Sequence, residues 1–296
     1  MAQVPFAHKH TEVKLKSVFD YANFYTRALR EKPNPTDPYR LHYLDAFAGT
    51  GEIPVAATDM PLLSEMIDAS EIMVGSARRA LSVQIPFSRY VFADAKKKNT
   101  RELSKLLNEF PHLRERIEIT HSDANAVVQD FCANLTSKDR ALVFLDPFGN
   151  QVKWQTLEVI ARTGKIDLWY LFPAWLGVAR QVKSNGLVLS DAEASIDQMF
   201  GPFNWRSEVV AAVPPAQSDM FGPDSPDLQK IATADGITRY MIKCMGTIFD
   251  KGVSQRWIPL GRNGRHYYSL LFACANRRES ARTLALKVVD HIMTRK

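Results

Sequence analysis

Apolar and polar positions alternate along the chain in two patterns. Short apolar runs that stop at an acid, a proline or a glycine loop are typical of buried strands. Between these runs, apolar residues recur at three- and four-residue steps, as on one face of a helix. Strands are predicted at 41–45, 89–93, 117–120, 141–145, 167–172, 254–260 and 266–275. Helices are predicted at 8–30, from 75 onward, and at 96–110, 124–135, 154–161, 225–249 and 278–294.

Strands that alternate with helices predict an α/β fold, doubly wound around a mostly parallel sheet. The last two predicted strands have only a short Asn263-Gly264 hairpin signal between them. We therefore expect a seven-stranded, Rossmann-like sheet with a C-terminal antiparallel hairpin, unlike an all-parallel dinucleotide-binding fold. Residues 1–38 are expected to form an N-terminal helix and a proline-rich linker. Residues 39–296 are expected to form the main domain, with insertions at about 53–74 and 174–222, the second irregular.

The segment from Leu44 to Glu52, LDAFAGTGE, follows the first apolar run. Asp45 ends the predicted strand, and Gly49 and Gly51 allow a sharp turn that a ligand can approach closely. An acid beside a glycine turn at a strand end is where a doubly wound sheet binds a nucleoside-bearing cofactor. The spacing fits the D-x-F-x-G-x-G pattern of S-adenosylmethionine-dependent methyltransferases and differs from GxGxxG. The alternative is a tight strand-to-helix turn without a ligand.

Two further predicted strands end close to an acid. Asp94 ends the second strand, where this architecture typically binds a ribose diol. Asp123 follows the third strand, where a methyltransferase would place it against the adenine amine. Asp123 also stands where it can cap the helix from residue 124, and the two roles are compatible.

The fourth strand runs into Asp146-Pro147-Phe148-Gly149. Proline fixes the backbone, so the acid is expected to face the cleft. Asp146 could accept a hydrogen bond from an amine that is being methylated and so position it, and Phe148 could stack on a planar base. The alternative is a rigid turn after a core strand. Asp146, Pro147 and Phe148 are the predicted catalytic residues.

Composition narrows the class of partner only slightly. The net charge of +6 and isoelectric point near 9.2 favour anionic partners, nucleic acid among them. A lysine-rich helix start at 96–98 is either a solvated face or a phosphate-binding surface. The three cysteines are far apart and form no CxxC pair, which argues against a zinc site or a disulfide framework. No signal core or apolar run of membrane-spanning length is evident, so we expect a cytoplasmic protein without membrane contact.

Several segments follow one another along the chain: the opening HKHTEVKLKSVFDYANFY and then LDAFAGTGE, VGSARRAL, YVFAD, SDAN, VFLDPFG and YYSLLFACAN. In this order they resemble the three-Cys-motif partner protein family, and the resemblance extends from about His8 to Met293. The resemblance implies a class I methyltransferase-like fold. It also implies a partner with a three-cysteine motif, similar to radical S-adenosylmethionine or iron–sulfur proteins. The cofactor positions that it carries over are Asp45, Phe47, Gly49, Gly51, Asp94 and Asp123. The DPFG segment resembles the DPPY motif of amino-methyltransferases but departs from it after the first proline.

Three functions follow as hypotheses. The first is an S-adenosylmethionine-dependent methyltransferase acting on a nucleic-acid amine. The second is a methyltransferase-like binding subunit that serves a cysteine-rich partner, which would do the chemistry. The third and weakest is a nuclease-like defence protein in which Asp45, Asp94 and Asp146 bind magnesium.

Overall fold

The computed structural model describes residues 6–50, 52–53, 73–188, 190–213, 227–262 and 265–295. Its main sheet has seven strands in the order β12-β13-β9-β8-β3-β6-β7. They are β3 (Arg40–Asp45), β6 (Arg89–Asp94), β7 (Ile117–His121), β8 (Asp139–Leu145), β9 (Ile166–Phe172), β12 (Ile258–Arg262) and β13 (Arg265–Cys274). The first five pair in parallel, and β13 is antiparallel to both β9 and β12. This topology confirms the predicted fold class, a doubly wound, mostly parallel, methyltransferase-like sheet with a C-terminal hairpin.

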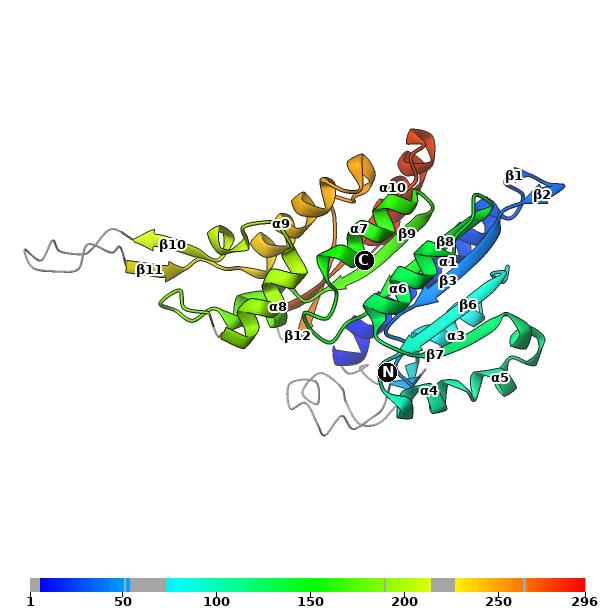
Figure 1. Cartoon of the computed structure of the whole chain (residues 1–296), viewed down its shortest axis with the longest axis horizontal. Coiled ribbons are helices and arrows are strands. Elements are labelled where there is room, and N and C mark those ends of the chain that lie inside the picture. The colour runs from blue at the N-terminus through cyan, green and yellow to red at the C-terminus, as the bar shows by residue number, and fades with distance from the viewer. Residues whose placement is uncertain are drawn as a thin grey trace, which may run out of the picture.

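Helices cover both faces of the sheet (Figure 1). The first face carries α1 (Phe6–Leu29), α3 (Ser76–Leu81), α4 (Lys97–Leu103), α5 (Leu106–Glu109) and α10 (Glu279–Thr294). The second face carries α6 (Ala124–Ala133), α7 (Trp154–Thr163), α8 (Ser190–Phe200) and α9 (Ala234–Gly246). The result is a three-layer arrangement with one apolar core on each side of the sheet.

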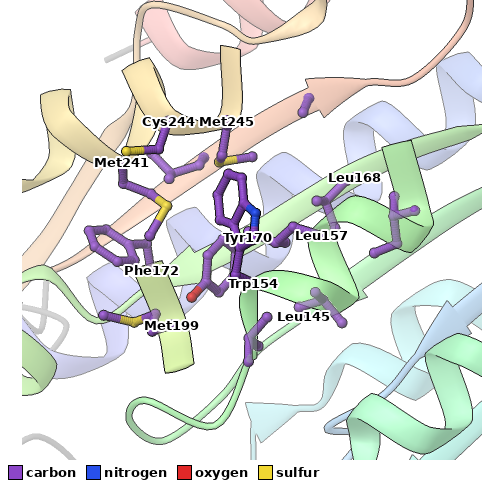
Figure 2. Close-up of a cluster of buried hydrophobic side chains, with 14 of the residues drawn as sticks. Leu145, Trp154, Leu157, Leu168, Tyr170, Phe172, Met199, Met241, Cys244 and Met245 are labelled. Atoms are coloured by element: carbon purple, nitrogen blue, oxygen red, sulfur yellow. The ribbon is translucent and has the colours of Figure 1, made fainter. Parts of the chain in front are cut away.

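Side-chain alternation along the strands supplies both cores. In β9, Trp169 and Leu171 belong to the core under α1, whereas Tyr170 and Phe172 belong to the core on the opposite face. Figure 2 shows the second core, where the two β9 rings lie near Trp154 of α7 and Met241 of α9. Because both faces of the central strands are buried, these strands read in the sequence as nearly continuous apolar runs.

Two smaller antiparallel pairs project from the domain. In one, β10 (Val210–Val213) pairs with β11 (Asp227–Lys230); in the other, β4 (Glu52–Ile53) pairs with β5 (Met73–Val74). A third pair joins β1 (Pro33–Asn34) to β2 (Asp37–Pro38) in the linker after α1. The residues on either side of the first predicted insertion are therefore paired with each other, and residues 54–72 lie outside the described part.

Two predictions about the C-terminal half were wrong. The segment 174–222 is not wholly irregular, because it contains α8 and β10, and the helix predicted from residue 225 begins only at Ala234, after the strand β11. The strands β10 and β11 were missed because they form by pairing with each other across a long connection, and a local pattern does not show this. The predicted Asn263-Gly264 turn lies outside the described residues.

Among the described residues, no helix is both long enough and apolar enough to cross a membrane.

Candidate active site at the carboxyl edge of the sheet

Four acids that the sequence places near strand ends lie at the carboxyl edge of the sheet. Asp45 and Asp94 are the last residues of β3 and β6, Asp146 follows β8 directly, and Asp123 comes two residues after β7. In the sheet register, Asp45 lies opposite Phe92 of β6 and Phe144 of β8. These two residues come two positions before Asp94 and Asp146, respectively. The structure therefore brings the predicted acids together at one edge, and their roles toward a ligand stay predictions.

Asp45 is fully buried, and both of its oxygens accept hydrogen bonds. Oδ1 accepts from the Phe47 amide at 3.1 Å, and Oδ2 accepts from Ser76 Oγ at 2.5 Å. Ser76 is the first residue of α3, and Gly75 occupies the cap position without a side-chain bond. The Ser76 hydroxyl is used to hold the buried carboxyl group of β3.

Burial is the main reason why the pKa of Asp45 rises to about 7. The charge of Asp146 raises this pKa as well, whereas the bonds from Ser76 and the Phe47 amide and the charge of Lys14 lower it. At neutral pH the Asp45 carboxyl is therefore divided between its protonated and ionised forms. A cation placed beside it would favour the ionised form.

The glycine loop after β3 is tied to the next strand through Asp94. The Gly49 amide donates to Asp94 Oδ2 at 3.1 Å, and the Ala48 amide donates to the Ala93 carbonyl at 2.9 Å. Gly49 has φ of +61°, and among the described residues a Cβ atom there would meet nothing within 4 Å. The backbone of this loop is therefore left-handed and open on its outer side. Gly51, the other predicted cofactor residue of the loop, lies outside the described residues.

Asp94 is buried and serves two loops at once. While Oδ2 takes the Gly49 amide, Oδ1 accepts from the Lys96 amide at 2.7 Å and from Asn99 Nδ2 at 3.0 Å. A carboxylate oxygen can accept two hydrogen bonds, so Oδ2 keeps the capacity to accept one more. The predicted contact to a ribose hydroxyl is compatible with this network.

Asp123 caps α6, as one of its two predicted roles requires. Its Oδ1 accepts from the amides of Asn125 at 3.0 Å and Ala126 at 3.2 Å. The residue is exposed, and within the described part of the chain its hydrogen bonds use Oδ1 and leave Oδ2 open. That oxygen is available to an adenine amine, so the cap and the predicted ligand contact do not exclude each other.

The DPFG segment has a fixed backbone and a projecting ring. The Phe148 amide donates to Gln151 Oε1 at 3.0 Å, and the Phe148 carbonyl accepts from the hydroxyl of Tyr268 at 3.2 Å. Pro147 is buried, whereas Phe148 keeps 51% of its surface exposed. An exposed aromatic ring on a fixed backbone is suited to stack on a planar ligand.

The functional partner that sequence reasoning missed is Lys14. From α1 its ammonium group donates to Asp146 Oδ2 at 2.5 Å, and the two side chains are only 14% and 21% exposed. The same helix is bonded at the opposite edge of the sheet, where the Tyr21 hydroxyl donates to buried Asp167 at 2.6 Å. α1 therefore runs across the sheet from one edge to the other. The basic start of α1 was the only signal in the sequence that could have indicated such a contact.

No protein-family model matches the chain, and no curated protein matches it. Among solved structures, protein LPL1258 from Legionella pneumophila is 14% identical, with 96% of this chain and 92% of that chain covered and a TM-score of 0.49. Magnesium protoporphyrin IX methyltransferase from Synechocystis PCC 6803, solved with bound SAH, is 13% identical, with 92% and 88% covered and a TM-score of 0.36. An rRNA methylase from Streptococcus thermophilus is 12% identical, with 72% and 93% covered and a TM-score of 0.31. Similarity at this level carries no functional argument, and the fold assignment rests on strand order and register.

Proposed function

We propose that this protein is an S-adenosylmethionine-dependent methyltransferase that acts on an amine of a nucleic acid. The observation that carries the proposal is the gathering of acids and an open glycine loop at one edge of a doubly wound sheet. Ligands of such sheets bind outside the carboxyl ends of the strands. We assign the cofactor to the β3–β6–β7 half of that edge and the substrate to the DPFG segment after β8.

The residues at this edge fit the chemistry of the cofactor. S-adenosylmethionine carries a sulfonium and an ammonium group, one carboxylate, a ribose diol and an adenine amine, so most of its polar groups other than the carboxylate need acceptors or negative charge. Asp45, Asp94 and Asp123 supply these, and the open backbone at Gly49 lets a ligand approach. Phe47 is half-buried beside Asp45 and contributes an apolar wall. When bound, the cofactor supplies an activated methyl group.

On the substrate side, the chain's own residues would bind and orient the amine. Within the described part of the chain, Lys14 engages Oδ2 of Asp146 and leaves Oδ1 available to accept from an N–H group. An amine held in this way keeps its lone pair directed away from the carboxylate, and fixed orientation of this kind is a large part of catalysis. Pro147 fixes the backbone below it, and the Phe148 ring provides a surface for the base.

A nucleic-acid substrate is favoured by the charge next to the site. α4 begins three residues after Asp94, and its start is lined by exposed cations. These are Lys96, Lys97, Lys98 and Arg101. The chain as a whole carries a net charge of +6. Phosphates beside the site would be attracted to this surface, and that attraction should weaken with salt.

Titration calorimetry with S-adenosylmethionine tests the cofactor half of the proposal. Because a bound cation should lower the pKa of Asp45 from about 7, binding at pH 7 should release up to about half a proton. The apparent enthalpy should therefore differ between two buffers of different ionisation enthalpy. Asp45→Asn should abolish the difference, and the absence of binding heat at high micromolar cofactor would contradict the proposal.

Mass spectrometry of oligonucleotides tests the substrate half. Single-stranded and double-stranded DNA and RNA are incubated with the protein and cofactor, and a gain of one methyl group on an amine-bearing base is expected. Asp146→Asn should reduce the gain strongly, whereas Asp37→Asn, which removes an exposed carboxylate paired with Lys138, is the matched control. Cofactor binding without methylation of any of the four substrates would leave a methyltransferase of another substrate class.

A second candidate function is the methyltransferase-like binding subunit that the family resemblance implies. The observation in its favour is the Lys14–Asp146 ion pair, because it occupies one oxygen of the proposed amine acceptor. Such a subunit would work with a three-cysteine, iron–sulfur or radical-type partner. Copurification with a cysteine-rich protein, together with methyl transfer or another reaction only when both chains are present, would support it over the first proposal.

The nuclease alternative gains no support from the part of the chain that is described. Within it, no group of three or more His, Cys, Asp or Glu side chains could hold a metal ion. Asp45 and Asp94 are already bonded to the chain, and Asp146 is paired with a lysine.

A further inference from the structure

The Lys14–Asp146 ion pair lies at the point where the proposed substrate amine would bind. Lys14 is held there by its helix, because its neighbour Leu15 and Val18, one turn further on, are buried in the core under α1. The ammonium group of Lys14 and a substrate amine are chemically similar donors. Both would compete for the carboxylate of Asp146.

Displacement of Lys14 would leave its ammonium group without a counter-charge in a mostly buried position. Within the described residues, the nearby acids are already engaged. Glu12 forms an ion pair with Arg79, and Asp45 accepts from Ser76 and a backbone amide. Removing one partner from such a pair is costly when the other remains buried. The cost falls if the incoming substrate brings its own anion.

We propose that Lys14 is a specificity-determining residue that selects phosphate-bearing substrates over free nucleosides. Lys14 leaves Oδ2 of Asp146 when a phosphate of the nucleic acid becomes its new partner, and the uncompensated carboxylate then accepts more strongly from the base amine at Oδ1. This inference rests on the proposed function, because it takes Asp146 as the amine acceptor. It extends that function by requiring a phosphate near the target base.

The test compares Lys14→Met with Lys16→Met. Lys16 lies on the same helix, is 59% exposed and pairs with Asp20 through a 2.8 Å contact, so its substitution removes the same charge without affecting Asp146. Cofactor binding is first measured by calorimetry in the wild type and in both variants. Affinities are then measured for deoxyadenosine, deoxycytidine and deoxyguanosine, and for a mixed-sequence single-stranded 12-mer at several salt concentrations.

Lys14→Met should bind its preferred nucleoside about fivefold more tightly than the wild type, because Asp146 no longer has Lys14 as a partner. This factor corresponds to the upper range of measured ion-pair energies. The slope of log affinity against log salt for the 12-mer should fall by about 0.7, as expected for one lost phosphate contact on a single strand. Lys16→Met should leave nucleoside affinity unchanged. Lys14→Gln is the second variant if Lys14→Met does not fold, as judged by circular dichroism and thermal melting.

The inference is overturned if a folded Lys14 variant binds nucleosides no better than the wild type. It is also overturned if the Lys16 variant shows the same gain. In those cases cofactor and 12-mer binding still support the proposed function. Absence of cofactor binding in all proteins would instead contradict the proposed function itself. Binding of the cofactor without any binding of the 12-mer would contradict both the nucleic-acid substrate and this inference.

Discussion

Replacement of Asp45 by asparagine should stabilise the protein, and increasingly so as the pH rises. The carboxyl group is fully buried at the end of β3, with one oxygen bonded to the Phe47 amide and the other to Ser76. An asparagine has the same shape, and its amide can accept from the Phe47 amide and donate to the Ser76 oxygen. The substitution therefore removes a buried titratable group while it keeps both contacts.

The sign follows from the direction of the shift. Burial raises the pKa of Asp45 from 3.8 to about 7, so the folded protein holds a proton that the unfolded chain releases between these values. Stability from this proton is fully present below pH 3.8 and is lost as the pH rises through 7. The gap of about 3 pKa units corresponds to about 4 kcal/mol in total, of which about 2–3 kcal/mol is lost between pH 5 and pH 8.

Urea denaturation at pH 5, 6, 7 and 8 measures this loss in the wild type and in Asp45→Asn. The stability difference between the two proteins should grow by about 2–3 kcal/mol from pH 5 to pH 8, in favour of the asparagine variant. Asp123→Asn, at an exposed position on the same edge, is the matched control. A difference that stays constant over this range, or one that the control reproduces, would refute the reasoning.

Three further predictions concern the site and its support. Phe148→Ala should change stability by less than about 0.5 kcal/mol, because the ring is half exposed, but should reduce methyl transfer to a base; urea denaturation and a methylation assay separate the two effects. Burial tends to raise the pKa of Asp139, but bonds from His42, a threonine and an arginine outweigh it and lower the pKa. Asp139→Asn should therefore cost about 1–3 kcal/mol at pH 7, and the cost should shrink as the pH falls below about 4 in acid denaturation experiments. Gly177→Ala would place a Cβ atom 1.9 Å from Asn150 Oδ1, so it should lower the urea midpoint by the equivalent of about 1–3 kcal/mol. An unchanged midpoint would contradict this close packing of Asn150 against Gly177.

The sheet and its acidic edge could be predicted from the sequence because their signals are local. A mostly apolar run of four or five residues followed by an acid identifies both a buried strand and its carboxyl end, as for Asp45, Asp94 and Asp146. The Asp123 cap was also predictable, because an acid before a helix commonly accepts from the first amides.

The remaining features depend on partners far apart in the chain. Lys14 meets Asp146 across 132 residues, and Ser76 meets Asp45 across 31. In sequence, the basic start of α1 looks like any solvated helix end. Only its packing against the sheet reveals which lysine lies over the site.

The position of α1 sets an order of events during synthesis. The ribosome produces this helix before the strands of the sheet, yet its aromatic face rests on the strands and helix that are made after the rest of the sheet. The ring centroids of Tyr21 and Phe272 in β13 are 4.9 Å apart, and α1 also contacts β12 and α10. A nascent chain therefore carries an undocked amphipathic helix until the C-terminal hairpin has left the exit tunnel. Because domains generally mature as units during translation, a shortened transcript lacking β12 and β13 should yield a chaperone-bound, protease-sensitive product in place of a smaller folded one.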